Sequence, residues 1–204
     1  RMIALIISDS KHETALLETY IKQIGYDTIT YNWFMKALDN LEEISPSLIV
    51  LNAVDYPRHW KVLAQYIKDS FSTKIVLYVQ DITEEEQKKA EYLNVLGYIK
   101  GFTNQDISDL KMLLLSDSEE NEISQETKEG ETKILFLNPK DGTICSGCGN
   151  FNDEQELIVN LDRNISLCPG DVLSDAALKT SQGIQCIQAE VSKVNESNLT
   201  LLVK

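Results

Sequence analysis

The chain has 204 residues, more than one domain usually contains, and 19 basic against 32 acidic residues give it a formal net charge of −13. That charge argues against a nucleic-acid surface, because no basic excess offsets the repulsion of phosphates. No apolar run approaches the roughly 18 to 20 residues that span a bilayer, and the apolar N-terminal stretch is too short for a signal peptide. We therefore expect a cytoplasmic protein of two domains that binds neither nucleic acid nor membrane.

Short apolar runs alternate with amphipathic stretches through the first half of the chain. Strands are predicted over residues 2–7, 28–31, 46–54, 74–79 and 97–99. Helices are predicted over residues 14–24, 33–41, 60–67, 83–96 and 103–115, and the fourth of them starts with a capping box from Thr83 to Glu86. Five strand–helix units in this order predict a doubly wound, parallel five-stranded α/β sheet of flavodoxin-like order.

The stretch from Pro46 to Val54 is predicted to be the buried central strand, because it contains four consecutive apolar residues that end at the polar Asn52. Functional side chains of open α/β sheets lie just beyond the carboxyl ends of such strands. This stretch, together with the order of elements over residues 2–115, resembles the response-regulator receiver (CheY-like) domains. In that family, the residue in the position of Asn52 is the aspartate that accepts a phosphoryl group.

The resemblance implies a degenerate phosphorylation site. Receivers have two adjacent acids after the first strand, and this chain has Ser8 and Asp9 there, so the affinity for Mg²⁺ should fall. The amide of Asn52 offers no nucleophilic oxygen anion. Val79 takes the place of the family's Thr or Ser, whereas Lys100 matches its lysine. We therefore expect a pseudo-receiver that is not phosphorylated.

Two alternatives stay open at this site. Asp55 lies three residues beyond the aligned position and is an alternative acceptor, as Asp9 would also be, and either would make the chain an active phosphorelay response regulator. The blander interpretation is that Asp9 and Lys100 are ordinary polar ends of strands that pair with Asn52. The missing nucleophile favours the blander interpretation.

The composition changes in the second half of the chain. Residues 116–131 contain seven acidic residues and one lysine, which predicts an extended acidic linker between domains over residues 1–115 and 132–204. Strands are then predicted over residues 133–137, 143–145, 156–161, 171–173, 184–194 and 198–203. Turn signals such as Asp141-Gly142 and Pro169-Gly170 separate them, so a small all-β barrel or sandwich is expected.

The segment 167–173, followed by the long strand pair 184–194 and 198–203, resembles a PilZ-type barrel. PilZ domains that bind cyclic di-GMP use an R-x-x-x-R pair and a D-x-S-x-x-G turn. The guanidinium groups of the pair stack on guanine and make bidentate hydrogen bonds to phosphate. The only arginine of this half is Arg163. Ser146 and Gly149 could match the turn, but Ile144 then takes the place of its aspartate. We expect no binding of cyclic di-GMP.

The four cysteines give one C-x-x-C pair, Cys145 and Cys148, and two single residues, Cys168 and Cys186. A closed structural zinc site needs four ligands, so one pair predicts no metal site, although zinc at Cys145 and Cys148 is the alternative. Reduced cysteines of the barrel are the simpler interpretation. No cofactor is expected.

These features predict a non-enzymatic bacterial signalling adaptor that acts by protein–protein contact. Large apolar side chains within residues 84–115 predict an interaction face, which would bind a protein partner or form a homodimer; its residues are Tyr92, Tyr98, Phe102 and Met112. The alternative is that these side chains pack inward. The rival functions are an active phosphorelay response regulator and a cyclic di-GMP effector.

Overall fold

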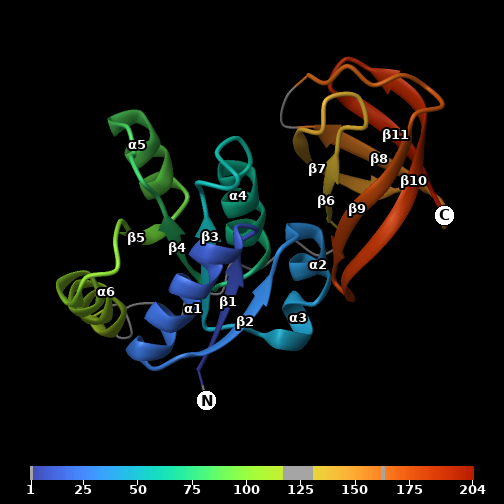
Figure 1. Cartoon of the computed structure of the whole chain (residues 1–204). Coiled ribbons are helices and arrows are strands. Elements are labelled where there is room, and N and C mark those ends of the chain that lie inside the picture. The colour runs from blue at the N-terminus through green and yellow to red at the C-terminus, as the bar shows by residue number, and fades with distance from the viewer. Residues whose placement is uncertain (1, 117–130, 162–163) are drawn as a thin grey trace. The chain divides into compact units, whose positions relative to one another are not determined.

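The computed structural model describes residues 2–116, 131–161 and 164–204 (Figure 1). The chain divides into two compact units, residues 1–125 and 126–204. Of the acidic linker predicted over residues 116–131, all but Ser116 and Glu131 lies outside the described residues. None of the described helices is both long and apolar enough to cross a bilayer.

The first unit contains a parallel five-stranded sheet in the order β2-β1-β3-β4-β5. Its strands are β1 (Ile3–Ile7), β2 (Asp27–Tyr31), β3 (Leu48–Asn52), β4 (Lys74–Tyr78) and β5 (Val95–Ile99). Every residue of β3 is buried, as the apolar run predicts for a strand covered on both faces. The predicted doubly wound α/β fold is confirmed.

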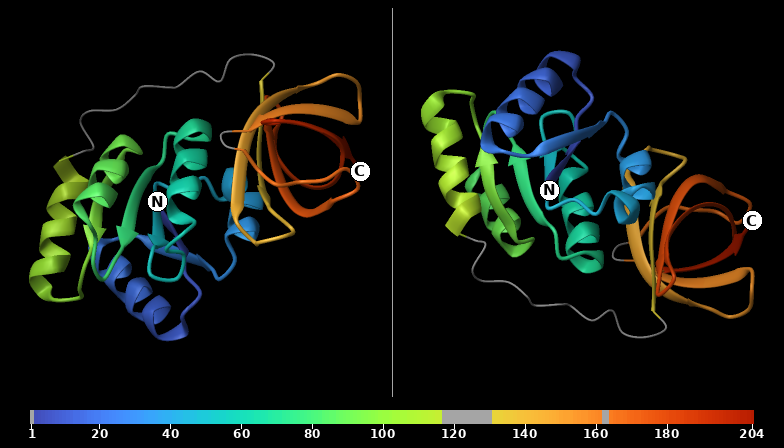
Figure 2. Two further views of the ribbon diagram at one scale, coloured as in Figure 1. Left: turned by 90° about the horizontal axis from the view of Figure 1, so that it is seen from above. Right: turned by 90° about the horizontal axis from the view of Figure 1, so that it is seen from below.

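Helices cover both faces of this sheet, and α1 and α4 lie on opposite sides of it (Figure 2). The helices are α1 (Lys11–Ile24), α2 (Phe34–Asp39), α3 (Leu41–Ile44), α4 (Trp60–Ser70), α5 (Glu84–Tyr92) and α6 (Asn104–Ser116). In α1 the buried residues are Leu17, Tyr20, Ile21 and Ile24, whose spacing places them on one helical stripe. This stripe and the buried side of α6 pack into one apolar core with Ile6 of β1 and Val50 of β3.

Two helices end earlier than the sequence predicts. The helix predicted over 33–41 breaks at Asn40, whose side-chain amide donates to the carbonyl of Lys36 (2.9 Å) and so closes α2 before α3 begins. The helix predicted to reach Leu96 ends at Tyr92, because Asn94 adopts a left-handed conformation with φ of 58°. Leu96 belongs to β5 instead.

The second unit is a closed barrel of six antiparallel strands in the order β10-β11-β8-β7-β6-β9. Its strands are β6 (Thr132–Leu137), β7 (Ile144–Phe151), β8 (Glu156–Leu161), β9 (Val172–Thr180), β10 (Gly183–Asn195) and β11 (Asn198–Val203). Phe136, Leu157 and Val191 point into its core. Closure pairs every strand on both sides and leaves no edge exposed. The all-β barrel predicted for this half is confirmed.

Strand β7 extends to Phe151, beyond the predicted 143–145, and its glycines lie close against β8. A Cβ on Gly147 would lie 2.6 Å from the backbone oxygen of Asn160, and a Cβ on Gly149 would lie 2.0 Å from that of Ile158. Glycine therefore lets β7 approach β8 closely, although it usually weakens a strand.

Candidate functional site

Asn52 ends the central strand β3 and is fully buried. Its amide nitrogen donates to the Ser8 hydroxyl (2.9 Å) and to the carboxylate of Glu13 (3.2 Å). Its amide oxygen accepts the backbone N–H groups of Val54 and Asp55, each at 3.1 Å. The side chain thus donates on one side and accepts on the other, which an amide can do and a carboxylate cannot.

Ser8 follows β1 and is also buried. Its oxygen accepts from Asn52 and from the hydroxyl of Thr14 in α1 (2.7 Å), and it lies 3.4 Å from a carboxylate oxygen of Asp55. Ser8 therefore joins the ends of β1 and β3 to the first turns of α1. The sequence reasoning named Ser8 and Asn52 but did not include Glu13 or Thr14 in the site.

Asp55 fastens the loop after β3 to the loop after β1. One carboxylate oxygen accepts the backbone N–H groups of Asp9 (2.7 Å) and Ser10 (3.1 Å), and the other accepts the Ser10 hydroxyl (2.6 Å). Burial raises the pKa of Asp55, but these hydrogen bonds together lower it more, so the pKa lies below its ordinary value of 3.8. Asp55 therefore holds its negative charge in this cluster.

Among residues 2–116, no hydrogen bond joins the side chains of Asp9, Val79 or Lys100 to Asn52, Ser8 or Asp55. The side chain of Asp9 is exposed, and only its backbone N–H reaches Asp55. Val79 is buried, and its backbone N–H donates to the carbonyl of Ile99 (3.0 Å). The ammonium of Lys100 lies 5.8 Å from the centre of the Tyr98 ring. Within residues 2–116, no hydrogen bond or ion pair joins Lys100 to Asn52, which binds Ser8 and Glu13 instead.

Tyr56 closes one side of the site. Its hydroxyl donates to the carbonyl of Asn32 (2.9 Å), and its ring meets the ring of Phe34 edge to face at 5.8 Å. Burial, followed by the negative charges of Asp9 and Asp55, raises the pKa of Tyr56 to about 12. The phenol therefore stays neutral and serves as a packing and hydrogen-bonding group.

The predicted interaction face separates into exposed and half-buried residues. Tyr92 and Met112 expose 65% and 69% of their surface, and Leu115, which the prediction did not include, exposes 64%. Phe102 is half-buried, because its ring packs 5.5 Å from that of Tyr20 and 5.6 Å from that of Tyr78. Tyr98 is half-buried as well.

The barrel does not place its motif residues as the sequence suggests. Ser146 and Gly149, which could match the serine and glycine of the D-x-S-x-x-G turn, lie inside strand β7 and pair with β6. Cys145 points into the core, and Cys148, three residues along the same strand, falls on the opposite face. This arrangement does not bring the two thiols together as a zinc knuckle would. Arg163 lies outside the described residues.

A family model and a relative each match part of this chain. A family model for an N-terminal domain, TP_0454_N, matches residues 2–95. An uncharacterized protein of Treponema pallidum (strain Nichols) is 46% identical over 67 residues, which are 33% of this chain and 29% of that protein. The chain thus spans less than a third of the length of this relative.

Solved structures match over a similar part of the chain. A two-component response regulator from Clostridium difficile has a TM-score of 0.51 at 16% identity, covering 59% of this chain and 100% of that one. A response regulator from Thermotoga maritima scores 0.50 at 14% identity and covers 56% and 98% of the two chains. One from Legionella pneumophila scores 0.50 at 20% identity and covers 57% and 99%. The first unit therefore has the fold of response-regulator receiver domains.

Proposed function

We propose that this chain is a non-enzymatic bacterial signalling adaptor, in which a pseudo-receiver is joined to a PilZ-like barrel and acts through protein contacts. The observation that carries the proposal is the environment of Asn52. Its amide stands where receivers have the acceptor aspartate, is fully buried, and has both its nitrogen and its oxygen engaged in hydrogen bonds. An amide in this position forms no acyl phosphate.

Mg²⁺ is the ion that the resemblance to receivers implies, and the residues present do not fit it. The ion needs several hard oxygen ligands in octahedral geometry. The amide nitrogen of Asn52 donates to the Ser8 hydroxyl and to the Glu13 carboxylate. This hydrogen-bond donor therefore lies between the two oxygens that would otherwise be available to a cation. The oxygens of Asp55 are taken by backbone and hydroxyl donors.

Asp55 is a poor replacement for the missing phosphoryl acceptor, because hydrogen bonds already hold its carboxylate oxygens. A carboxylate that attacks a phosphoryl group needs one oxygen free to approach in line. Each oxygen of Asp55 already accepts a hydrogen bond shorter than 2.8 Å, from Asp9 and from Ser10. Phosphorylation there would separate the loop after β3 from the loop after β1. Treatment with acetyl phosphate and Mg²⁺, read by intact mass, tests this directly.

The barrel is proposed to be PilZ-like without the nucleotide site. The closed antiparallel architecture supports the likeness to a PilZ barrel. The absence of the nucleotide site is supported by the single arginine in residues 132–204, because cyclic di-GMP binding by PilZ domains uses a guanidinium pair. Calorimetry should show no binding heat with micromolar cyclic di-GMP. A micromolar dissociation constant would instead favour the rival function of a cyclic di-GMP effector.

Protein contact is proposed as the output, in the cytoplasm. Met112 and Leu115 lie three positions apart on α6 and are both largely exposed, so they form an apolar stripe on one side of the helix. A second copy of the chain or another protein could bind this stripe. The four cysteines are all described and form no disulfide, which fits a reducing compartment.

A further inference from the structure

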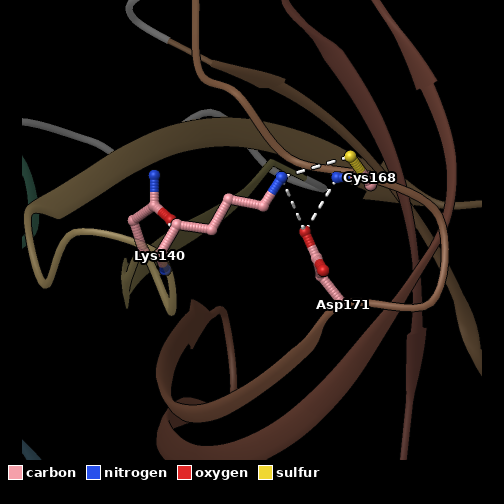
Figure 3. A network of polar contacts seen from close by, with 4 residues as sticks. Lys140, Cys168 and Asp171 are labelled. Carbon is pink, nitrogen blue, oxygen red and sulfur yellow. Dashed lines mark hydrogen bonds and ion pairs between the residues drawn. The ribbon is translucent and has the colours of Figure 1, made fainter.

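Lys140, Cys168 and Asp171 form a polar cluster on the barrel that the proposed function does not use (Figure 3). The ammonium of Lys140 donates to the Cys168 sulfur at 3.1 Å and lies 3.7 Å from a carboxylate oxygen of Asp171. The same oxygen accepts the backbone N–H of Cys168 at 2.8 Å. A cation, a nucleophilic thiol and a carboxylate therefore meet at one point, although Lys140 and Cys168 are 28 residues apart.

The two segments that supply these groups are each held in place. Lys140 lies in the connection between β6 and β7, where Asn138 accepts the backbone N–H of Lys140 (2.9 Å) and pairs with Thr143 (2.8 Å). Cys168 begins a tight turn that the N–H of Asp171 closes onto its carbonyl (3.1 Å). The next hydrogen bond, from Gly170 to Val191 (2.7 Å), ties this turn to β10. The contact between lysine and thiol thus joins two ordered turns.

The cluster has the accessibility and the charge that thiol chemistry needs. Cys168 is exposed, in contrast to Cys145, which lies in the barrel core. The hydrogen bond to Cys168, with further contributions from the charges of Cys168 and Asp171, raises the pKa of Lys140 above its ordinary value of 10.5. Lys140 is therefore a cation at neutral pH. Reactive thiols characteristically lie beside such a cation in a partly exposed position.

We propose that Cys168 is a modification site for hydroperoxides and that Lys140, which contacts the reacting sulfur, takes part directly in the reaction. The sulfur forms a bond to one peroxide oxygen while the O–O bond breaks. The departing oxygen takes a proton from the Lys140 ammonium, and the thiol proton returns to the amine. The products are a sulfenic acid on Cys168 and one molecule of water or alcohol, so the sulfur is oxidised by two electrons and the peroxide is reduced by two.

The sulfenic acid would stay within reach of both partners. Its oxygen can accept from the Lys140 ammonium, which replaces the contact that the thiol made at 3.1 Å. The modification would change the polar link between the β6–β7 connection and the turn before β9 without entering the barrel core. It is independent of the receiver-like unit, so its failure would leave the proposed function untouched.

The test measures sulfenic acid on the full chain after brief exposure to hydrogen peroxide, using dimedone as the trapping reagent and peptide mass spectrometry as the readout. Cys186 is also exposed and provides an internal reference on the same molecule. The measured quantity is the ratio of labelling at Cys168 to labelling at Cys186. Four proteins are compared: the wild type, Lys140→Gln, Lys140→Arg and Cys168→Ser.

We expect labelling of Cys168 to exceed that of Cys186 in the wild type. The ratio should fall roughly three- to fivefold in Lys140→Gln, the scale of one exposed charged contact, and return toward the wild-type value in Lys140→Arg. Cys168→Ser should abolish the label at that position alone. A wild-type ratio of one or less, or a ratio that Lys140→Gln leaves unchanged, would overturn the proposal.

Discussion

Asn52 and Ser8 are joined by a hydrogen bond of 2.9 Å from the amide nitrogen to the hydroxyl oxygen, and both residues are buried at the carboxyl end of the sheet. The resemblance to receivers implies acidic residues at these two positions. Here an amide and a hydroxyl satisfy each other, and Glu13 accepts the second N–H of the amide.

The substitution Asn52→Asp restores the acceptor type of receivers, and we expect it to destabilise the fold. The new carboxylate would place a second negative charge where the amide now donates to Glu13 at 3.2 Å. The loss should be about 1 to 3 kcal/mol in the free energy of unfolding, measured with urea. Adding Glu13→Gln should recover part of it, because the repulsion is removed. Equal stabilities of Asn52→Asp with and without Glu13→Gln would contradict this account.

Asp55 should make the stability depend on pH in the acidic range. Its pKa in the folded state lies below the ordinary value of 3.8, so its contribution is complete above the unfolded-state pKa and is lost as the pH falls through the folded-state pKa. We expect Asp55→Asn to lower the free energy of unfolding by about 1 to 2 kcal/mol near neutral pH. This difference from wild type should shrink steadily below about pH 4. The check is urea unfolding of both proteins across that range, and a constant difference would show that the charge is not responsible.

Gly149→Ala should destabilise the barrel, because the added methyl group would lie 2.0 Å from the backbone oxygen of Ile158. Backbone cannot move aside as a flexible side chain can, so the two strands must separate. The control is Gly142→Ala, where a Cβ meets nothing within 4 Å and only the positive φ of 69° is unfavourable. Calorimetry should show the larger fall in melting temperature for Gly149→Ala. Similar shifts for both variants would mean that β7 and β8 can relax.

Self-association through α6 is tested by Met112→Glu. Met112 is 69% exposed, so the substitution should leave the fold intact while it places a charge in the proposed contact. Sedimentation equilibrium of the full chain should show a dimer that dissociates at least about tenfold more readily in the variant. Leu16→Glu, on the exposed side of α1, is the matched control and should have no effect. A wild type that is monomeric at every concentration would exclude the homodimer.

Much of the first unit could be predicted from the sequence because its strands are buried on both faces. Such strands are continuous apolar runs, as in β3, and leave little ambiguity. The predicted capping box at the start of α5 is likewise a local signal: the Thr83 hydroxyl accepts the backbone N–H of Glu86 at 3.1 Å and donates to its carboxylate at 2.9 Å. A structural feature can be predicted from a local pattern when the residues of that pattern also make the contact.

The missed features depend on contacts between distant residues. Glu13 reaches Asn52 across 39 positions, and only its place in the first turn after β1 could have suggested it. Strand β7 contains Gly147 and Gly149, which the local pattern disfavours and only the approach of β8 explains. Phe102 follows β5 and would have been expected at the surface, but it packs against Tyr20 of α1.

The most direct test of the central claim is exposure of the full chain to acetyl phosphate and Mg²⁺, followed by intact mass measurement. The account predicts no added phosphoryl group on the wild type or on Asp55→Ala, because Asn52 has no nucleophilic oxygen and the oxygens of Asp55 are held by Asp9 and Ser10. A receiver with its acceptor aspartate, treated in parallel, confirms that the reagent is active. A stoichiometric phosphoryl group on the wild type that is lost in Asp55→Ala would contradict the account and identify Asp55 as the acceptor.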